Sequence, residues 1–154
     1  SGACLGKDEF GRRIAFEDVE TGGAFVVFGQ RRDMFEIARH YTHFFAEESC
    51  GFCTPCRVGT SLLRNVVDKI ASGKGSQHDL ARIEQLGRLM RVASHCGLGE
   101  SAPRPLLDTL RRFRPAYERR LGSSALEPAF DLDGALDRAR RMTGRDDQGA
   151  HLPP

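Results

Sequence analysis

The stretch from Cys50 to Cys56 reads Cys-Gly-Phe-Cys-Thr-Pro-Cys, which places three thiols at a spacing of three residues. A fourth cysteine, Cys96, stands alone in Ser-His-Cys-Gly-Leu-Gly, residues 94–99. Thiols packed this closely are typical of a loop that wraps around a metal centre, and a thiol from elsewhere in the fold can complete the coordination. The economical hypothesis is a [4Fe–4S] cluster held by Cys50, Cys53, Cys56 and Cys96.

Zinc, disulfides and free thiols are the alternatives. Structural zinc sites usually draw their ligands from two separated pairs, whereas this chain has a triplet and a single cysteine. His43 and His95 could replace a thiolate, but neither has a partner at zinc-finger spacing. Disulfides are disfavoured by the odd total of five cysteines and by the absence of a signal peptide. The fifth cysteine, Cys4, is interpreted as a small buried hydrophobic residue rather than a ligand.

The composition is that of an ordinary globular chain. Its 154 residues are 40% hydrophobic and 29% charged, with a net charge of +2. This balance argues against nucleic acid as a partner, and no apolar run is long enough to insert into a membrane. We therefore expect a cytoplasmic protein. The arginine-rich stretches 111–114 and 138–141 are interpreted as solvated helix faces, with contact to an acidic partner subunit as the alternative.

Apolar residues at helical spacing predict four helices between residues 33 and 121. Asp33 is the expected N-cap of the first helix, which ends near Ser49. The second ends at Gly73-Lys74-Gly75, the third ends just before Cys96, and the fourth begins at Ser101 or Ala102. The expected apolar faces are Met34, Ile37, Ala38, Tyr41, Phe44 and Phe45; Leu62, Leu63, Val66, Val67 and Ile70; Leu80, Ile83, Leu86, Met90 and Ala93; and Leu106, Leu107, Leu110, Phe113 and Tyr117.

Short connections between these helices favour an antiparallel four-helix bundle. In that arrangement the loop after the first helix and the loop after the third lie at the same end, so Cys96 meets the triplet. Gly51, Gly97 and Gly99 would let the backbone approach a cluster closely. Cys56 is expected at a helix N-terminus, where the helix dipole favours a thiolate, and Arg57 is interpreted either as a positive charge beside the cluster or as a solvated arginine.

The segments on either side of the bundle have different patterns. Residues 13–19 and 24–28 are strand-like, with a turn at Thr21-Gly22-Gly23, and they predict the edge of a small α/β domain. The chain begins with Ser rather than Met, and we interpret it as a segment of a longer polypeptide. After Gly122 the stretch Phe130-Asp131-Leu132-Asp133 begins a basic helix that ends near Met142. Residues 144–154 are expected to be disordered.

The stretch from Glu48 to Gly59, with Cys96-Gly97-Leu98-Gly99 downstream, resembles the C-terminal region of the NADH-binding flavoprotein subunit of respiratory complex I. The same region occurs in diaphorase subunits of NAD-reducing hydrogenases and of NAD-dependent formate dehydrogenases. The resemblance covers residues 10–121. Residues 13–18 and 130–133 look more like the hydrogenase branch than complex I.

The resemblance implies a division of labour in a longer protein. An upstream domain would bind FMN and NADH, a small ubiquitin-like domain would follow, and the iron–sulfur bundle would exchange single electrons between the flavin and iron–sulfur partner subunits. Cys50, Cys53, Cys56 and Cys96 match the family's ligand positions. This chain has no G-x-G-x-x-G phosphate loop, so we expect no oxidation of NADH by the chain alone.

The expected fold is therefore mainly α. Residues 1–32 are assigned to the last strands of a ubiquitin-like (SLBB-type) α/β domain, residues 33–121 to a four-helix [4Fe–4S] bundle, and residues 122–154 to a tail with one short helix. A helical module clamped by zinc that only docks partners is the alternative function.

Overall fold

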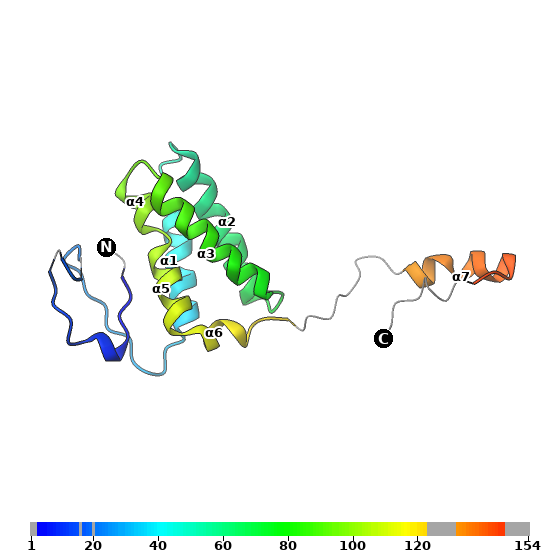
Figure 1. The fold of residues 1–154 in the computed structure, drawn as a ribbon, viewed down its shortest axis with the longest axis horizontal. Helices are drawn as coiled ribbons and strands as arrows, with labels where there is room; N and C mark the ends of the chain where they lie inside the picture. The colour runs from blue at the N-terminus through cyan, green and yellow to red at the C-terminus, as the bar shows by residue number, and fades with distance from the viewer. Residues whose placement is uncertain (1–2, 16, 20, 123–131, 147–154) are drawn as a thin grey trace. The chain divides into compact units, whose positions relative to one another are not determined.

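The computed structural model describes residues 3–15, 17–19, 21–122 and 132–146. The chain divides into two compact units, residues 1–123 and 124–154. The first unit contains a 3-10 turn and six helices, and the second contains one helix within its described residues (Figure 1). The elements are η1 Lys7–Glu9, α1 Met34–Glu47, α2 Thr54–Ala71, α3 Gln77–Ala93, α4 Gly97–Ser101, α5 Arg104–Arg112, α6 Arg114–Glu118 and α7 Leu132–Thr143.

Local sequence signals explain where the long helices begin. The Asp33 side chain accepts a hydrogen bond of 3.0 Å from the backbone N–H of Phe35, as expected of the N-cap of α1. Pro55 stands in the first turn of α2, where its missing N–H costs nothing. Ser76 caps α3: its hydroxyl accepts from the backbone N–H of Asp79, and the Asp79 carboxylate accepts from the backbone N–H of Ser76. Of these three starts, the sequence analysis predicted the Asp33 cap, which depends on neighbouring residues alone.

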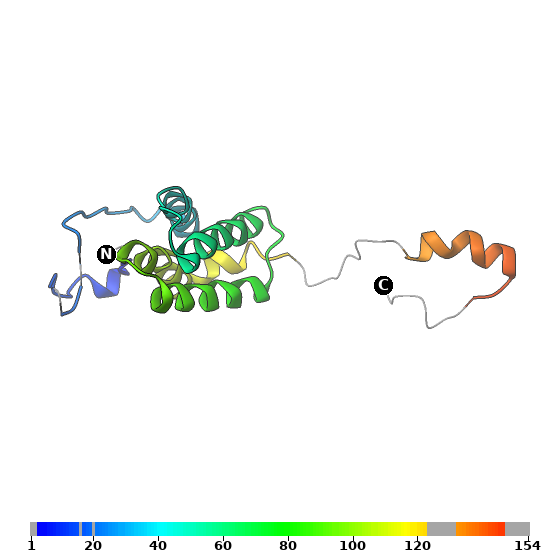
Figure 2. The same ribbon diagram turned by 90° about the horizontal axis from the view of Figure 1, so that it is seen from above.

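Helices α1, α2, α3 and α5 form the predicted four-helix bundle. α1 packs against α2 and α5, α3 packs against the same two helices, and the short α4 contacts α2, α3 and α5 (Figures 1 and 2). The α1–α2 connection and the α3–α4 connection carry the cysteines. Because α4 follows α3 directly and its Gly99 lies beside Cys56 in the first turn of α2, the end of α3 and the start of α2 lie at the same end of the bundle.

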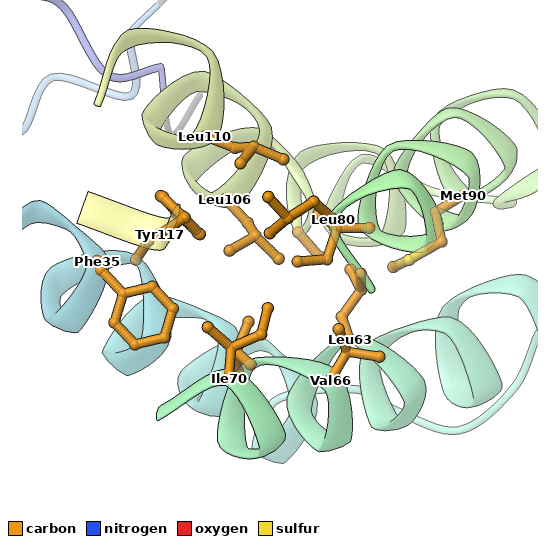
Figure 3. Close-up of a cluster of buried hydrophobic side chains, with 13 residues drawn as sticks. Phe35, Leu63, Val66, Ile70, Leu80, Met90, Leu106, Leu110 and Tyr117 are labelled. Carbon is orange, nitrogen blue, oxygen red and sulfur yellow. The ribbon is translucent and has the colours of Figure 1, made fainter. Parts of the chain in front are cut away.

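A hydrophobic core fills the space between these helices (Figure 3). Each fully buried aliphatic side chain contributes about 1.5–3 kcal/mol relative to exposure, so the core accounts for a large part of the bundle's stability. Its least exposed large side chains are Phe35, Leu63, Val67, Ile70, Leu80, Ile83, Met90, Leu106, Leu110 and Tyr117.

The buried face of α1 differs from the predicted one. Phe35, Ala38 and Thr42 are buried, whereas Phe44 is 48% exposed. Phe35 packs edge-to-face on Tyr117, with ring centroids 5.0 Å apart. The apolar stripe of α1 is wide, and the positions of α2, α5 and Tyr117 of α6 decide which part of it becomes core.

The predicted fourth helix is divided into α5 and α6. The break falls at Phe113, with φ −122° and ψ 37°. Pro115 is the physical reason: it has no N–H to donate, and its ring would clash with the carbonyl of Arg111 in a continuous helix. Tyr117 nevertheless reaches the core from α6, and its hydroxyl lies 2.6 Å from Oγ1 of Thr109.

The strands predicted for residues 13–19 and 24–28 are wrong as far as these residues are described; Phe16 lies outside the described residues. Phe25, Val26 and Val27 are 63%, 62% and 86% exposed. The β-pairing within the described ranges is one isolated bridge between Gly75 and Leu121. A strand needs a partner for its backbone groups, and these two stretches have none there.

The second unit contains α7, which matches the predicted basic helix closely. Its Arg141 pairs with Asp137 one turn earlier. Phe130 and Asp131 of the predicted start, and residues 147–154 of the predicted disordered tail, lie outside the described residues. None of the helices that the structure describes is both long and apolar enough to cross a membrane.

Asp79 is a buried carboxylate that ties α3 to the end of α2. Its side chain accepts hydrogen bonds from Lys69 Nζ at 2.8 Å and from the backbone N–H of Ser76 at 2.8 Å. Burial acts to raise the pKa of Asp79, but these hydrogen bonds outweigh it and hold the pKa below its ordinary value. The charged form is therefore favoured in the folded state.

We expect Asp79→Asn to lower the free energy of unfolding by about 1–3 kcal/mol at pH 7, because it weakens the bond to Lys69 and removes a cap acceptor. The folded-state pKa is depressed, so this stabilisation is present above about pH 4 and is lost as the pH falls through the folded pKa. Urea denaturation at equal iron content measures the change. Glu84→Gln, which affects a pair with Arg88 at 3.7 Å on the surface of α3, is the matched control; equal losses in the two variants would contradict the role of Asp79.

Candidate metal centre

The cysteine triplet begins in the loop after α1 and continues into α2. Cys50 is exposed in the loop, Cys53 is the N-cap of α2, and Cys56 is buried in the first turn of that helix. Gly51 between them has φ +76°, a backbone conformation that glycine adopts without strain. The expectation that Cys56 lies at a helix N-terminus is confirmed.

Cys96 is the N-cap of α4 and is exposed. Its neighbours contact the triplet loop directly. The rings of His95 and Phe52 meet edge-to-face with centroids 5.8 Å apart, and the backbone N–H of His95 is the main cause of a lowered pKa at Cys53. The backbone N–H of Cys56 contributes next to the same shift. The two cysteine segments therefore lie together at one end of the bundle.

The ligand set itself stays a prediction. Within the described residues, no three Cys, His, Asp or Glu side chains form a group that could hold a metal ion as they stand. His43 lies apart from the cysteines in a pair with Asp68, with Nε2 and Oδ1 2.8 Å apart. Asp68 also accepts from Arg39 Nε at 2.8 Å, so this group links α1 to α2.

Arg57 fixes the shape of the cysteine loop. Its guanidinium group donates to the backbone carbonyl of Gly51 and, at 3.3 Å, to that of Phe52. A second nitrogen donates to Oγ1 of Thr54 at 3.4 Å. From the sequence, Arg57 was interpreted either as a positive charge beside the cluster or as a solvated arginine. In the structure its side chain folds back on its own loop, and residue spacing alone does not indicate this.

Cys4 lies on a different part of the bundle from the other cysteines. Its backbone N–H donates to Oδ2 of Asp108 in α5 at 3.1 Å. Burial is the main cause, and the Asp108 carboxylate the second, of a raised pKa at the Cys4 thiol. The side chain is half-buried among polar neighbours rather than in the hydrophobic core predicted for it.

The donors and the backbone around them fit an iron–sulfur cluster. Backbone N–H groups, first that of His95 and next that of Cys56, lower the pKa of the Cys53 thiol and so favour its thiolate form. Gly99 leaves space that a side chain would fill, since a Cβ there would lie 2.4 Å from Ser94 Oγ and 3.1 Å from Cys56 Cβ. Ser94 Oγ is buried beside this point without a hydrogen-bond partner among the described residues.

Comparison with known proteins agrees with this assignment. The family model described as NADH-ubiquinone oxidoreductase-F iron-sulfur binding region matches residues 36–120. The chain is 43% identical over 139 residues to the NAD-reducing hydrogenase HoxS subunit alpha of Cupriavidus necator, covering 88% of this chain and 23% of the relative. It is 29% identical to the mitochondrial NADH-ubiquinone oxidoreductase 51 kDa subunit of Neurospora crassa, covering 85% and 27%.

A solved structure shows the same fold. The chain matches the crystal structure of an NAD⁺-reducing [NiFe]-hydrogenase in the H₂-reduced state with a TM-score of 0.74 and 45% identity, over 96% of this chain and 26% of that one. The chain thus spans about a quarter of the length of the relatives that it matches.

Proposed function

Because this chain belongs to the NADH-ubiquinone oxidoreductase-F iron–sulfur binding region family, we propose that it holds its [4Fe–4S] cluster on Cys50, Cys53, Cys56 and Cys96 and relays single electrons. The observation that carries this proposal is that the two cysteine segments meet: the rings of His95 and Phe52 are in edge-to-face contact, and Gly99 lies beside Cys56. When bound, a [4Fe–4S] cluster supplies a one-electron couple.

The residues of the chain have separate tasks in this proposal. The four thiolates bind iron, and backbone N–H groups donated to Cys53 hold negative charge on its sulfur. Arg57 keeps the loop in shape through the carbonyls of Gly51 and Phe52. The four bundle helices hold the two segments at a constant separation.

We further propose that the electrons pass between FMN, bound by another domain of the full-length protein, and iron–sulfur clusters of partner subunits. An NAD-reducing hydrogenase is the favoured parent complex, because the HoxS relative is 43% identical over 88% of this chain; a formate dehydrogenase or complex I is the alternative. The domain limits at residues 32 and 121 and a cytoplasmic location are parts of the same proposal.

Exposed apolar side chains near the cysteines support contact with a partner subunit. Phe52 in the cysteine loop is 77% exposed, and Val92 in the last turn of α3 is 88% exposed. Leu89, one turn before Val92, is also exposed. Apolar side chains gathered beside a redox centre are typical of a surface that another protein covers.

We expect the cluster-loaded chain to be brown, with broad visible absorption that dithionite bleaches and NADH does not. Dithionite can reduce an exposed cluster directly, whereas NADH transfers a hydride and needs a flavin. Absorption spectra before and after each reductant, with iron and zinc analysis, measure this. A colourless protein that contains zinc would favour the helical docking module, and bleaching by NADH alone would place a nucleotide and flavin site within these 154 residues.

A further inference from the structure

Ser94 carries a buried hydroxyl group that the fold does not use. It is the C-cap residue of α3, and its backbone N–H donates to Met90 O at 3.1 Å. The residue is 9% exposed, and its Oγ has no hydrogen-bond partner among the described residues. Buried hydroxyl groups are nearly always paired in folded proteins, so an unpaired one needs an explanation.

The Ser94 side chain lies close to Cys56, because both pack against Gly99. A Cβ added to Gly99 would lie 2.4 Å from Ser94 Oγ and 3.1 Å from Cys56 Cβ, so both side chains contact the same side of Gly99. A second serine, Ser49, already has its Oγ 3.4 Å from Cys56 Sγ. Two hydroxyl groups therefore lie near Cys56: that of Ser49 is within hydrogen-bond distance of its sulfur, and that of Ser94 has no partner in the part of the chain that the structure describes.

We propose that the Ser94 hydroxyl donates a hydrogen bond to sulfur at the Cys56 corner of the bound cluster and thereby raises its reduction potential. This inference rests on the proposed function. A donor to a cluster sulfur offsets part of the negative charge that reduction adds, so it stabilises the reduced state more than the oxidised one. Ser94 thus tunes the cluster by direct contact with its sulfur and does not bind iron.

The test compares Ser94→Thr with Ser94→Val in cluster-loaded protein, by redox titration followed with EPR. Threonine and valine have nearly the same shape, but only threonine keeps the hydroxyl. We expect a potential close to that of the wild type for Ser94→Thr and a more negative potential for both Ser94→Val and Ser94→Ala. Ser72→Ala, which removes a hydroxyl bonded to Lys69 O at the other end of α2, is expected to leave the potential unchanged.

Equal potentials for the threonine and valine variants would overturn the inference. Loss of the cluster in the alanine and valine variants, with retention in the threonine variant, would support it, because the hydroxyl would then be needed to hold the cluster. Wild-type protein without a [4Fe–4S] signal would instead overturn the proposed function, so the two failures are distinguishable.

Discussion

Replacing Cys96 with alanine is expected to remove most of the bound cluster. Three thiolates remain, in the loop before α2 and in the first turn of that helix. A site with three thiolates holds a [4Fe–4S] cluster poorly, so we expect decay to a [3Fe–4S] form or to apoprotein. Metal binding to the folded state is part of the folding free energy. A thousandfold loss of affinity for the cluster would lower the free energy of unfolding by about 4 kcal/mol. Iron analysis, low-temperature EPR and thermal melting measure these effects.

The surroundings of Cys96 make this variant easy to interpret. Its side chain is exposed, and it makes no capping hydrogen bond to α4. Truncation therefore removes little packing, and surface substitutions of this kind usually change stability by less than about 0.5 kcal/mol. A large loss of stability in the loaded protein would have to come from the lost iron ligand.

Cys4→Ala is the matched control for the ligand assignment. Cys4 packs beside Asp108 of α5, away from both cysteine loops, so its variant should keep a full complement of iron. If Cys4→Ala loses iron and Cys96→Ala keeps it, the proposed ligand set is wrong, and Cys4 takes the place of Cys96.

Local signals explain what could be predicted from the sequence. Asp33 caps α1 through its own neighbour Phe35, as predicted, and the predicted helix order places both cysteine segments at one end. The break at Phe113 follows from Pro115, which disrupts the interior of a helix; the prediction of one continuous fourth helix rested on apolar spacing and did not include this residue.

Three-dimensional contacts explain what could not be predicted. Arg57 turns back to the carbonyls of Gly51 and Phe52, and Ser94 is buried beside Gly99, yet residue spacing indicates neither contact. The strand prediction for residues 24–28 failed for the related reason that a strand depends on a partner elsewhere. In each case the outcome depends on how the backbone folds in three dimensions, which the spacing of residue types does not specify.

The buried face of α1 shows the same dependence on distant contacts, and Phe35→Ala tests it. We expect this variant to lower the free energy of unfolding by about 3–5 kcal/mol, because it empties a fully buried aromatic site. The ring also packs on Tyr117 at 5.0 Å and lies under the Arg120 guanidinium, 4.5 Å from the ring centroid. Denaturation followed by circular dichroism, at matched iron content, measures the loss.

Phe44→Ala is the matched control, because it makes the same truncation on the same helix. Phe44 is 48% exposed, and its ring contact in the structure is with Phe45 at 5.3 Å, so we expect a cost of about 1 kcal/mol or less. Apolar spacing alone places Phe44 in the core and does not include Phe35. Equal costs for the two variants would contradict the packing described for α1. A large cost for Phe35 alone would support it, with Phe35 in the core and Phe44 at the surface.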